Sequence, residues 1–210
     1  TSAPNGESKW ISGAGSRKQV HRQRAQHDAV MVGIETALKD QAKLTVRDWP
    51  LIAKPPAKII VDSNLRLPSD HPVLAGHDEG EVILFCNEKA NSELMKRLQE
   101  KDATVIGIES DENGRLSVKA MVQALAEKKI MSVYIEGGRS LAGSFIREKL
   151  ADRIVVFIAP KIIGSTNFST SAVQSLLPDN GMEAAFNLED IEIKIIEDQD
   201  VMITGTIGKE

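Results

Sequence analysis

Short apolar runs alternate with amphipathic stretches along the chain. The apolar runs are rich in Val, Ile and Leu, which is typical of strands buried on both faces of a parallel sheet. They predict strands at residues 28–34, 58–61, 82–86, 104–108, 132–135 and 153–158. The stretches between them repeat apolar residues at helical spacing, which predicts helices at 91–100, 117–128 and 140–150. Strands that alternate with helices indicate a doubly wound α/β domain.

The C-terminal part has a different pattern. Apolar and polar residues alternate over 191–196 and again over 201–207, and the polar residues 198–200 separate the two runs. This pattern predicts a β-hairpin that is appended to the sheet and makes it mixed. We expect the apolar face of the hairpin to serve as a seam between two copies of the chain. The segment 165–187 is long for a connection, so we expect it to hold a short helix around 172–177.

Composition narrows the class of protein. A chain of 210 residues with 41% hydrophobic and 27% charged residues is long enough to fold as one domain without a metal or disulfide. Its net charge of −4 argues against broad binding to nucleic acid, which needs a basic surface. The single cysteine, Cys86, permits no internal disulfide and reads as a buried core thiol. No apolar run approaches the roughly 20 residues of a membrane span, and we expect a cytoplasmic protein.

A basic helix is predicted near the start of the chain. Ser16 and Gln19 fit a capping box, which places the first residue of the helix at Ser16. Arg17, His21 and Arg24 then fall on one face. A row of cations can hold a phosphate, and arginine can do so with two parallel hydrogen bonds. The alternative is a solvated helix face that binds nothing.

Two predicted strands end beside polar residues that could contact a ligand. In open α/β sheets, ligands bind outside the carboxyl ends of the strands. Thr36 follows the first strand, although an ordinary strand–helix turn would also explain it. Ser63 and Arg66 follow the second strand, and an arginine there could bind the 2′-phosphate that distinguishes NADP from NAD. The alternative is a turn in which Asp62 and Ser63 cap backbone groups.

The segment Tyr-Ile-Glu-Gly-Gly-Arg-Ser-Leu-Ala-Gly at 134–143 predicts a strand, a Gly-Gly turn and a helix. Glycines let backbone N–H groups approach a pyrophosphate at a helix N-terminus. The spacing is not that of the Rossmann fingerprint. Glu136 ends the strand, where a carboxylate could orient a substrate or handle a proton; the alternative is a capping residue in a tight turn. The four histidines lack ligand spacing, so we expect no metal site.

Six stretches together resemble a known family. They are GESKWI (6–11), RAQHDAVMVGIETAL (24–38), LTVR (44–47), IIVDSNLRLP (59–68), YIEGGRSLAG (134–143) and IAPKIIGS (158–165). Each is weak alone, but their order is that of the reductase domain of the bifunctional riboflavin-biosynthesis deaminase–reductases. The resemblance implies a three-layer α/β/α fold like that of dihydrofolate reductase, with a mostly parallel mixed sheet and a C-terminal antiparallel hairpin.

The resemblance also implies an activity. The family uses NADPH to reduce 5-amino-6-(5-phosphoribosylamino)uracil, with hydride passing to the anomeric carbon so that the ribose becomes a ribityl chain. The positions that match the family's substrate contacts are Ser8, Arg24, Leu44, Arg47 and Glu136. The positions that match its cofactor contacts are Trp10, Thr36, Asp40, Ser63, Gly138, Arg139, Ser140, Leu141, Ala142, Gly143 and Ser144. To these we add Arg66 for the 2′-phosphate, and we expect Glu136 to orient the ribose hydroxyls.

The sequence departs from the family pattern in three places. Gln41 and Ala42 follow Asp40, where the family usually has a proline. The family's first strand and its S-L-D-G-K-type loop would precede Thr1. Gly13 and Gly15 loosen the entry to the basic helix. Apart from these departures, the zinc signature of the deaminase half, H-x-E with P-C-x-x-C, does not occur. We therefore expect residues 1–210 to be a single reductase domain, acting in a homodimer or higher homo-oligomer and belonging to a protein with a fused deaminase.

Two other functions remain open from the sequence. The related reductase that acts before deamination would take the diaminopyrimidinone precursor instead. A non-catalytic module could bind a nucleotide or serve for dimerisation. Dihydrofolate reductase itself is disfavoured, because phosphate-binding arginines have no role in that reaction.

Overall fold

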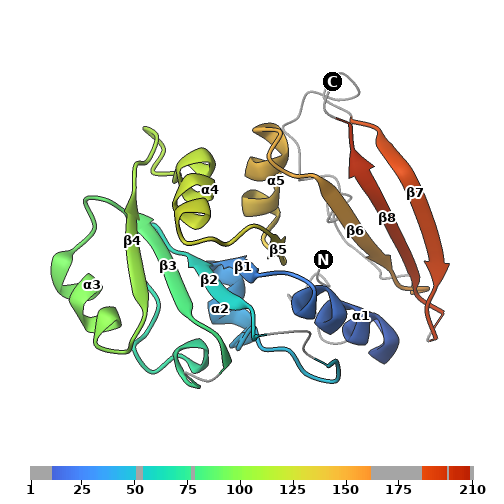
Figure 1. Ribbon diagram of the computed structural model, residues 1–210, viewed down its shortest axis with the longest axis horizontal. Coiled ribbons are helices and arrows are strands. Elements are labelled where there is room, and N and C mark those ends of the chain that lie inside the picture. Colours follow the sequence, from blue (N-terminus) through green and yellow to red (C-terminus); the bar gives the residue numbers. More distant parts are fainter. Residues whose placement is uncertain (1–10, 51–53, 77–78, 162–185, 198, 209–210) are drawn as a thin grey trace, which may run out of the picture. The chain divides into compact units, whose positions relative to one another are not determined.

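The computed structural model describes residues 11–50, 54–76, 79–161, 186–197 and 199–208 (Figure 1). The chain divides into two compact units, residues 21–141 and residues 1–20 with 142–210. Each unit has its own β-sheet. Ser8, Trp10 and the short helix expected at 172–177 lie outside the described residues.

The unit of residues 21–141 is built on a parallel sheet of order β4-β3-β2-β1-β5. Its strands are β1 (Ala29–Gly33), β2 (Ala57–Val61), β3 (Val82–Asn87), β4 (Thr104–Ile108) and β5 (Val133–Ile135). The predicted strand positions are confirmed to within one residue. The Val/Ile/Leu runs of β1, β2 and β3 are almost completely buried, as expected for strands covered on both faces.

Helices connect these strands, and the apolar pattern predicts two of them, at 91–100 and 117–128. The connecting helices are α2 (Ile34–Asp40), α3 (Ser92–Gln99) and α4 (Val118–Glu127), and a short 3₁₀ turn, η1 (Pro72–Leu74), precedes β3. Asn91 and Ser117 cap α3 and α4 by accepting backbone N–H bonds. Side chains of α2 and α3 pack with Val30, Val32 and Ile60 in one apolar cluster.

The order in which strands are added to the sheet reverses at β1. The chain passes from β1 to β2, β3 and β4 in one direction, and then returns through α4 to β5 on the other side of β1. Parallel crossovers are right-handed, so the reversal places α4 on the opposite face from α2 and α3 (Figure 1). The carboxyl ends of β1 and β5 therefore lie side by side at a topological switch point, where ligands of such sheets bind.

The other unit contains an antiparallel sheet of order β6-β8-β7. The strands are β6 (Arg153–Ile158), β7 (Leu188–Ile195) and β8 (Val201–Ile207), so the predicted hairpin is confirmed. The expectation that it joins the parallel strands in one mixed sheet is wrong for the described residues, because β8 pairs with β6 instead. The α/β class with an added antiparallel hairpin holds.

The first helix, α1, runs from Ala14 to Ala25, so the predicted start at Ser16 is wrong. The Ser16 side chain does not cap the helix. Its hydroxyl donates to Asp200 Oδ2 at 2.6 Å, and the backbone N–H of Gly13 donates to the same oxygen at 2.7 Å. A buried carboxylate from the β7–β8 turn thus satisfies the start of the helix. Among the described residues, no helix combines the length and apolarity that a membrane crossing requires.

Candidate functional site

The candidate site begins where β1 and β5 end. The two strands pair in parallel, with Met31 opposite Ile135, and the backbone N–H of Glu136 continues the ladder by donating to Met31 O at 2.9 Å. Glu136 is therefore fixed by sheet geometry at the carboxyl edge. The residues after each strand, Thr36 and the Gly137–Gly138 turn, are brought to the same place.

The Gly137–Gly138 turn packs closely on Thr36. Both glycines adopt left-handed backbone conformations, with φ of 57° and 64°. A Cβ added to Gly137 would lie 3.2 Å from Thr36 Cγ2, and one added to Gly138 would lie 3.7 Å from its Oγ1. The turn therefore requires glycine for its conformation and, at Gly137, for space as well. The Thr36 hydroxyl makes no hydrogen bond to another described side chain or backbone group, so it keeps its capacity for a ligand.

Arg24 and Glu136 form the best-defined polar pair of the site. Arg24 Nε donates to Glu136 Oε1 at 2.6 Å, and Nη2 donates to Oε2 at 2.7 Å. The third nitrogen, Nη1, donates to the backbone carbonyl of Thr45 at 2.7 Å. The two side chains are only 12% and 16% exposed, so this fork-to-fork pair is shielded from water. The arginine predicted to clamp a phosphate is thus already bonded to the carboxylate.

The segment around Arg47 lies against helix α1, which carries Arg24. Leu44 is buried and has a left-handed φ of 56°, and Asp48 has the same φ. Such conformations are unfavourable for residues with a Cβ, and they concentrate at functional sites. The backbone N–H of Arg47 donates to His21 Nδ1 at 3.1 Å, while the Arg47 side chain is exposed. Arg47 is therefore fixed through its backbone and available through its guanidinium.

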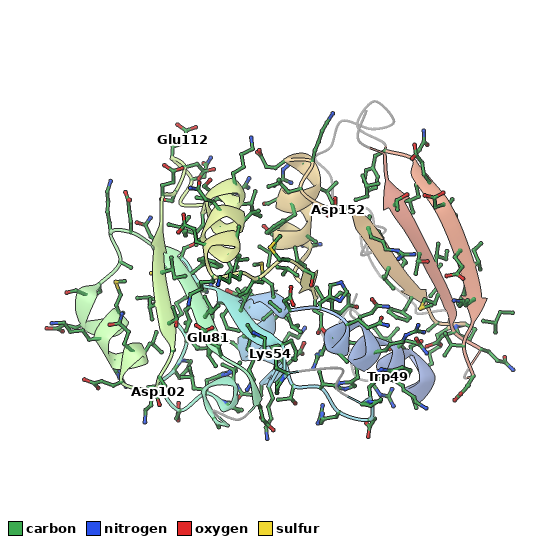
Figure 2. All side chains as sticks on the ribbon, viewed as in Figure 1. Trp49, Lys54, Glu81, Asp102, Glu112 and Asp152 are labelled. Carbon is green, nitrogen blue, oxygen red and sulfur yellow. The ribbon has the colours of Figure 1, made fainter. Side chains whose placement is uncertain are left out.

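Only part of the predicted row of cations on α1 lies at the candidate site. Arg17 Nη1 donates to Ser12 O at 2.8 Å, near the start of its own helix. The guanidinium of Arg22 lies 5.6 Å from the centroid of the Trp49 ring, a cation–π contact with the segment that carries Arg47. Trp49 is labelled in Figure 2. Among Arg17, His21 and Arg24, the last two contact the candidate site.

The turn after β2 carries a second charged cluster. Asp62 is fully buried, and its Oδ2 accepts from the Leu67 N–H at 2.9 Å, which agrees with the capping role considered for this turn. Burial raises the pKa of the Asp62 carboxyl. Arg66 lies 3.7 Å from Asp62 Oδ1 through Nε and 2.5 Å from Glu35 Oε1 through Nη1. Half of the Arg66 side chain stays exposed, and the Ser63 hydroxyl makes no hydrogen bond to another described residue.

The remaining described positions that were predicted to contact the cofactor lie on helices. Asp40 is the exposed last residue of α2, and Gln41 closes that helix in a left-handed conformation with φ of 48°. The positions 139–144 form the first part of α5 (Arg139–Arg147), directly after the glycine turn. In the described ranges, no cluster of three or more His, Cys, Asp and Glu residues could hold a metal ion.

Sequence reasoning placed His21 in a row of cations but did not foresee that its ring accepts a hydrogen bond, and it gave Thr45 no role. Thr45 contributes a backbone carbonyl, for which side-chain patterns carry no signal. His21 lies three residues before Arg24, so the two share a helix face, and that spacing was the available signal. Burial and the neighbouring Arg24 and Arg47 guanidinium groups lower the pKa of His21, and Glu136 and Asp48 oppose them.

Comparisons with known proteins agree with this architecture. The model of the RibD C-terminal domain family matches residues 1–199. "Riboflavin biosynthesis protein RibD" from Aquifex aeolicus is 38% identical over 159 residues, which are 76% of this chain and 42% of that protein. The chain thus spans less than half of that relative.

Two further relatives bear on the fold and the activity. "5-amino-6-(5-phosphoribosylamino)uracil reductase" from Buchnera aphidicola is 29% identical over 171 residues, which are 76% of this chain and 79% of that protein. The solved diaminohydroxyphosphoribosylaminopyrimidine deaminase/5-amino-6-(5-phosphoribosylamino)uracil reductase from Thermotoga maritima is similar in fold, with a TM-score of 0.71 and 26% identity. That similarity covers 99% of this chain and 52% of the solved chain.

Proposed function

The chain belongs to the RibD C-terminal domain family, and from this we propose that it is an NADPH-dependent reductase of 5-amino-6-(5-phosphoribosylamino)uracil in riboflavin biosynthesis. The observation that carries the proposal is the shielded Arg24–Glu136 pair beside the glycine turn at the end of β5. It joins the residue types expected for the substrate to those expected for the cofactor. The name of the Buchnera relative, which this chain matches over 79% of its length, supports the same reaction.

We assign the substrate to the side of the site formed by Arg24, Arg47, Glu136 and Leu44, with Ser8 as a further contact. An ionised carboxylate only accepts hydrogen bonds, and its two oxygens have about four lone-pair positions in all. Arg24 occupies two of them, so Glu136 can still accept from ribose hydroxyls. The exposed Arg47 guanidinium is suited to the phosphate. This arrangement favours Glu136 as the residue that orients the ribose.

The cofactor side of the proposed site fits a nicotinamide dinucleotide. The Gly137–Gly138 turn carries no side chains of its own and packs beside the Thr36 hydroxyl, which makes no hydrogen bond to another described group. The first backbone N–H groups of α5 are suited to a pyrophosphate, and the predicted positions 139–144 lie in this part of the helix. The unbonded Ser63 hydroxyl and the half-exposed Arg66 are suited to the 2′-phosphate of NADP. Trp10 and Asp40 complete the proposed set.

When bound, NADPH would supply the hydride for the ribosyl carbon. The residues of the chain supply position: Arg24 fixes the Glu136 carboxylate, and that carboxylate fixes the sugar through its hydroxyls. Arg47 holds the phosphate end of the same molecule. Two anchors on one substrate restrict its orientation, which lowers the entropy cost of reaching the transition state.

Three further features belong to the proposal. Ile191, Ile193 and Ile195 on β7 are between 57% and 79% exposed, which supports self-association as a homodimer or higher homo-oligomer through this face. The Thermotoga protein combines a deaminase and this reductase in its name, which supports a fused deaminase for this reductase. The single cysteine permits no disulfide within residues 1–210, and low cysteine usage supports a cytoplasmic location.

The substitution Arg47→Ala tests the proposed site. It should raise the KM for the phosphorylated substrate by about 30-fold, because a charge-assisted contact to phosphate is worth about 2 kcal/mol. The KM for NADPH should stay near the wild-type value. A loss of NADPH affinity with an unchanged substrate KM would show that the two sides of the site are assigned the wrong way round.

A further inference from the structure

His21 makes a hydrogen bond that the proposed function does not use. Its Nδ1 accepts from the backbone N–H of Arg47 at 3.1 Å, across 26 positions of sequence. One turn later on the same helix, Arg24 donates to Thr45 O at 2.7 Å. Helix α1 therefore holds the segment 44–48 at two points.

The segment needs such bonds to keep its shape. Leu44 and Asp48, which flank it, both have left-handed backbone conformations that are unfavourable for residues with a side chain. Arg47 itself is exposed, so packing of its side chain does not fix its direction. Among the described contacts, the hydrogen bond from the Arg47 N–H to His21 fixes the backbone position from which the Arg47 side chain extends.

The surroundings favour the neutral imidazole. Arg24 on the same helix and Arg47 on the facing segment are both cationic, and together with burial they lower the pKa of His21. Asp48 on that segment and Glu136 at the end of β5 have the opposite, smaller effect. A neutral ring with its proton on Nε2 leaves the Nδ1 lone pair for the Arg47 N–H, whereas an imidazolium has no acceptor.

We propose that His21 is a positioning residue for phosphate recognition, which uses its neutral Nδ1 to hold the Arg47 backbone and so to aim the guanidinium at the phosphate of a phosphorylated sugar. The inference rests on the proposed function, because it takes Arg47 as the phosphate-binding residue. This positioning role and a direct role in binding the phosphate predict opposite changes of substrate affinity with pH. A cationic His21 that bound the phosphate itself would bind better as the pH falls, whereas an acceptor binds worse.

The test compares His21→Ala and His21→Asn with the wild type. We expect His21→Ala to raise the KM for the ribosylaminouracil phosphate about five-fold, the effect of one lost hydrogen bond, with kcat and the KM for NADPH nearly unchanged. Asparagine places an acceptor oxygen near the position of Nδ1, so His21→Asn should restore most of the affinity. Gln26→Ala, an exposed position just after the same helix, is the matched control.

The pH profile separates the two roles. The substrate phosphate also titrates near pH 6, so the contribution of His21 is the difference between the wild-type and His21→Asn profiles. We expect that difference to show a wild-type KM that rises as the pH falls. A wild-type KM that falls relative to His21→Asn, or a His21→Ala enzyme with unchanged KM, would overturn the inference.

Failure of the proposed function gives a different result. If Arg47→Ala leaves the substrate KM unchanged, the assignment of Arg47 is wrong whatever His21 does. If Arg47→Ala raises the KM and His21→Ala does not, the proposed function stands and the inference about His21 is refuted. Long-range ¹H–¹⁵N NMR of the wild-type protein provides a readout without any variant, and it should show an unprotonated Nδ1 at neutral pH.

Discussion

The Arg24–Glu136 pair should contribute to stability as a shielded ion pair and not as a surface one. Two short hydrogen bonds, of 2.6 and 2.7 Å, join side chains that are 12% and 16% exposed. Exposed pairs contribute about 0.2–1 kcal/mol, whereas removing one partner of a buried pair costs about 3–5 kcal/mol. Small residual exposure places the expected coupling between these values, at about 2 kcal/mol.

A double-mutant cycle measures this coupling. Arg24→Met and Glu136→Gln keep the approximate size of each side chain, and urea unfolding of both single variants and the double variant gives the free energies. Arg24→Met also removes the bond to Thr45 O, but that loss occurs in both arms that contain the variant and cancels. A coupling below about 0.5 kcal/mol would refute the account, because it is the value of a solvated pair.

Three other predictions follow from described contacts. Lys58→Met should stabilise the protein by about 1–4 kcal/mol in urea unfolding, because the buried Lys58 ammonium makes no hydrogen bond to a described residue and lies 3.8 Å from the half-exposed Glu79. Burial lowers the pKa of Lys58, so the unfolded state binds more protons and the stability of the wild type rises with pH. The stability gained by Lys58→Met should therefore shrink at alkaline pH. A variant less stable than the wild type at neutral pH would contradict the prediction. Asp200→Ala should cost about 2–4 kcal/mol, because it leaves Gly13 N–H and Ser16 Oγ without their acceptor, whereas Ser16→Ala should cost about 1 kcal/mol; equal losses would disprove the shared role. Arg66→Ala should narrow the ratio of NADH to NADPH dissociation constants about ten-fold, against Arg97→Ala as control, and an unchanged ratio would remove Arg66 from the 2′-phosphate site.

Local sequence pattern predicted the elements better than their partners. The Val/Ile runs of β1, β2 and β3 indicated buried strands, and these lie where expected. The alternation in β7 and β8 indicated a hairpin, but alternation does not predict which further strand pairs with it. In the structure that strand is β6, which pairs with β8. The predicted capping box at Ser16 was wrong for a related reason, because the Ser16 hydroxyl donates to the carboxylate of Asp200, 184 positions away.

The site shows the same limit. The glycine turn, Thr36 and Glu136 were predictable, because parallel strands bring their carboxyl ends to one edge. The bonding of Arg24 was not predictable, because one of its partners is the backbone carbonyl of Thr45. The hydrogen bond of His21 was likewise not predictable, because its partner is a backbone N–H on a segment whose left-handed residues carry no glycine signal. Side-chain patterns identify which groups gather at a site, whereas backbone partners emerge from the fold.

The central claim is tested most directly by following NADPH oxidation with 5-amino-6-(5-phosphoribosylamino)uracil and, in parallel, with its undeaminated diaminopyrimidinone precursor. The account predicts turnover of the deaminated compound, with little or none of the precursor. Turnover of the precursor alone would assign the chain to reduction before deamination. Bound NADPH without turnover of either compound would contradict the proposed reductase and favour a binding module.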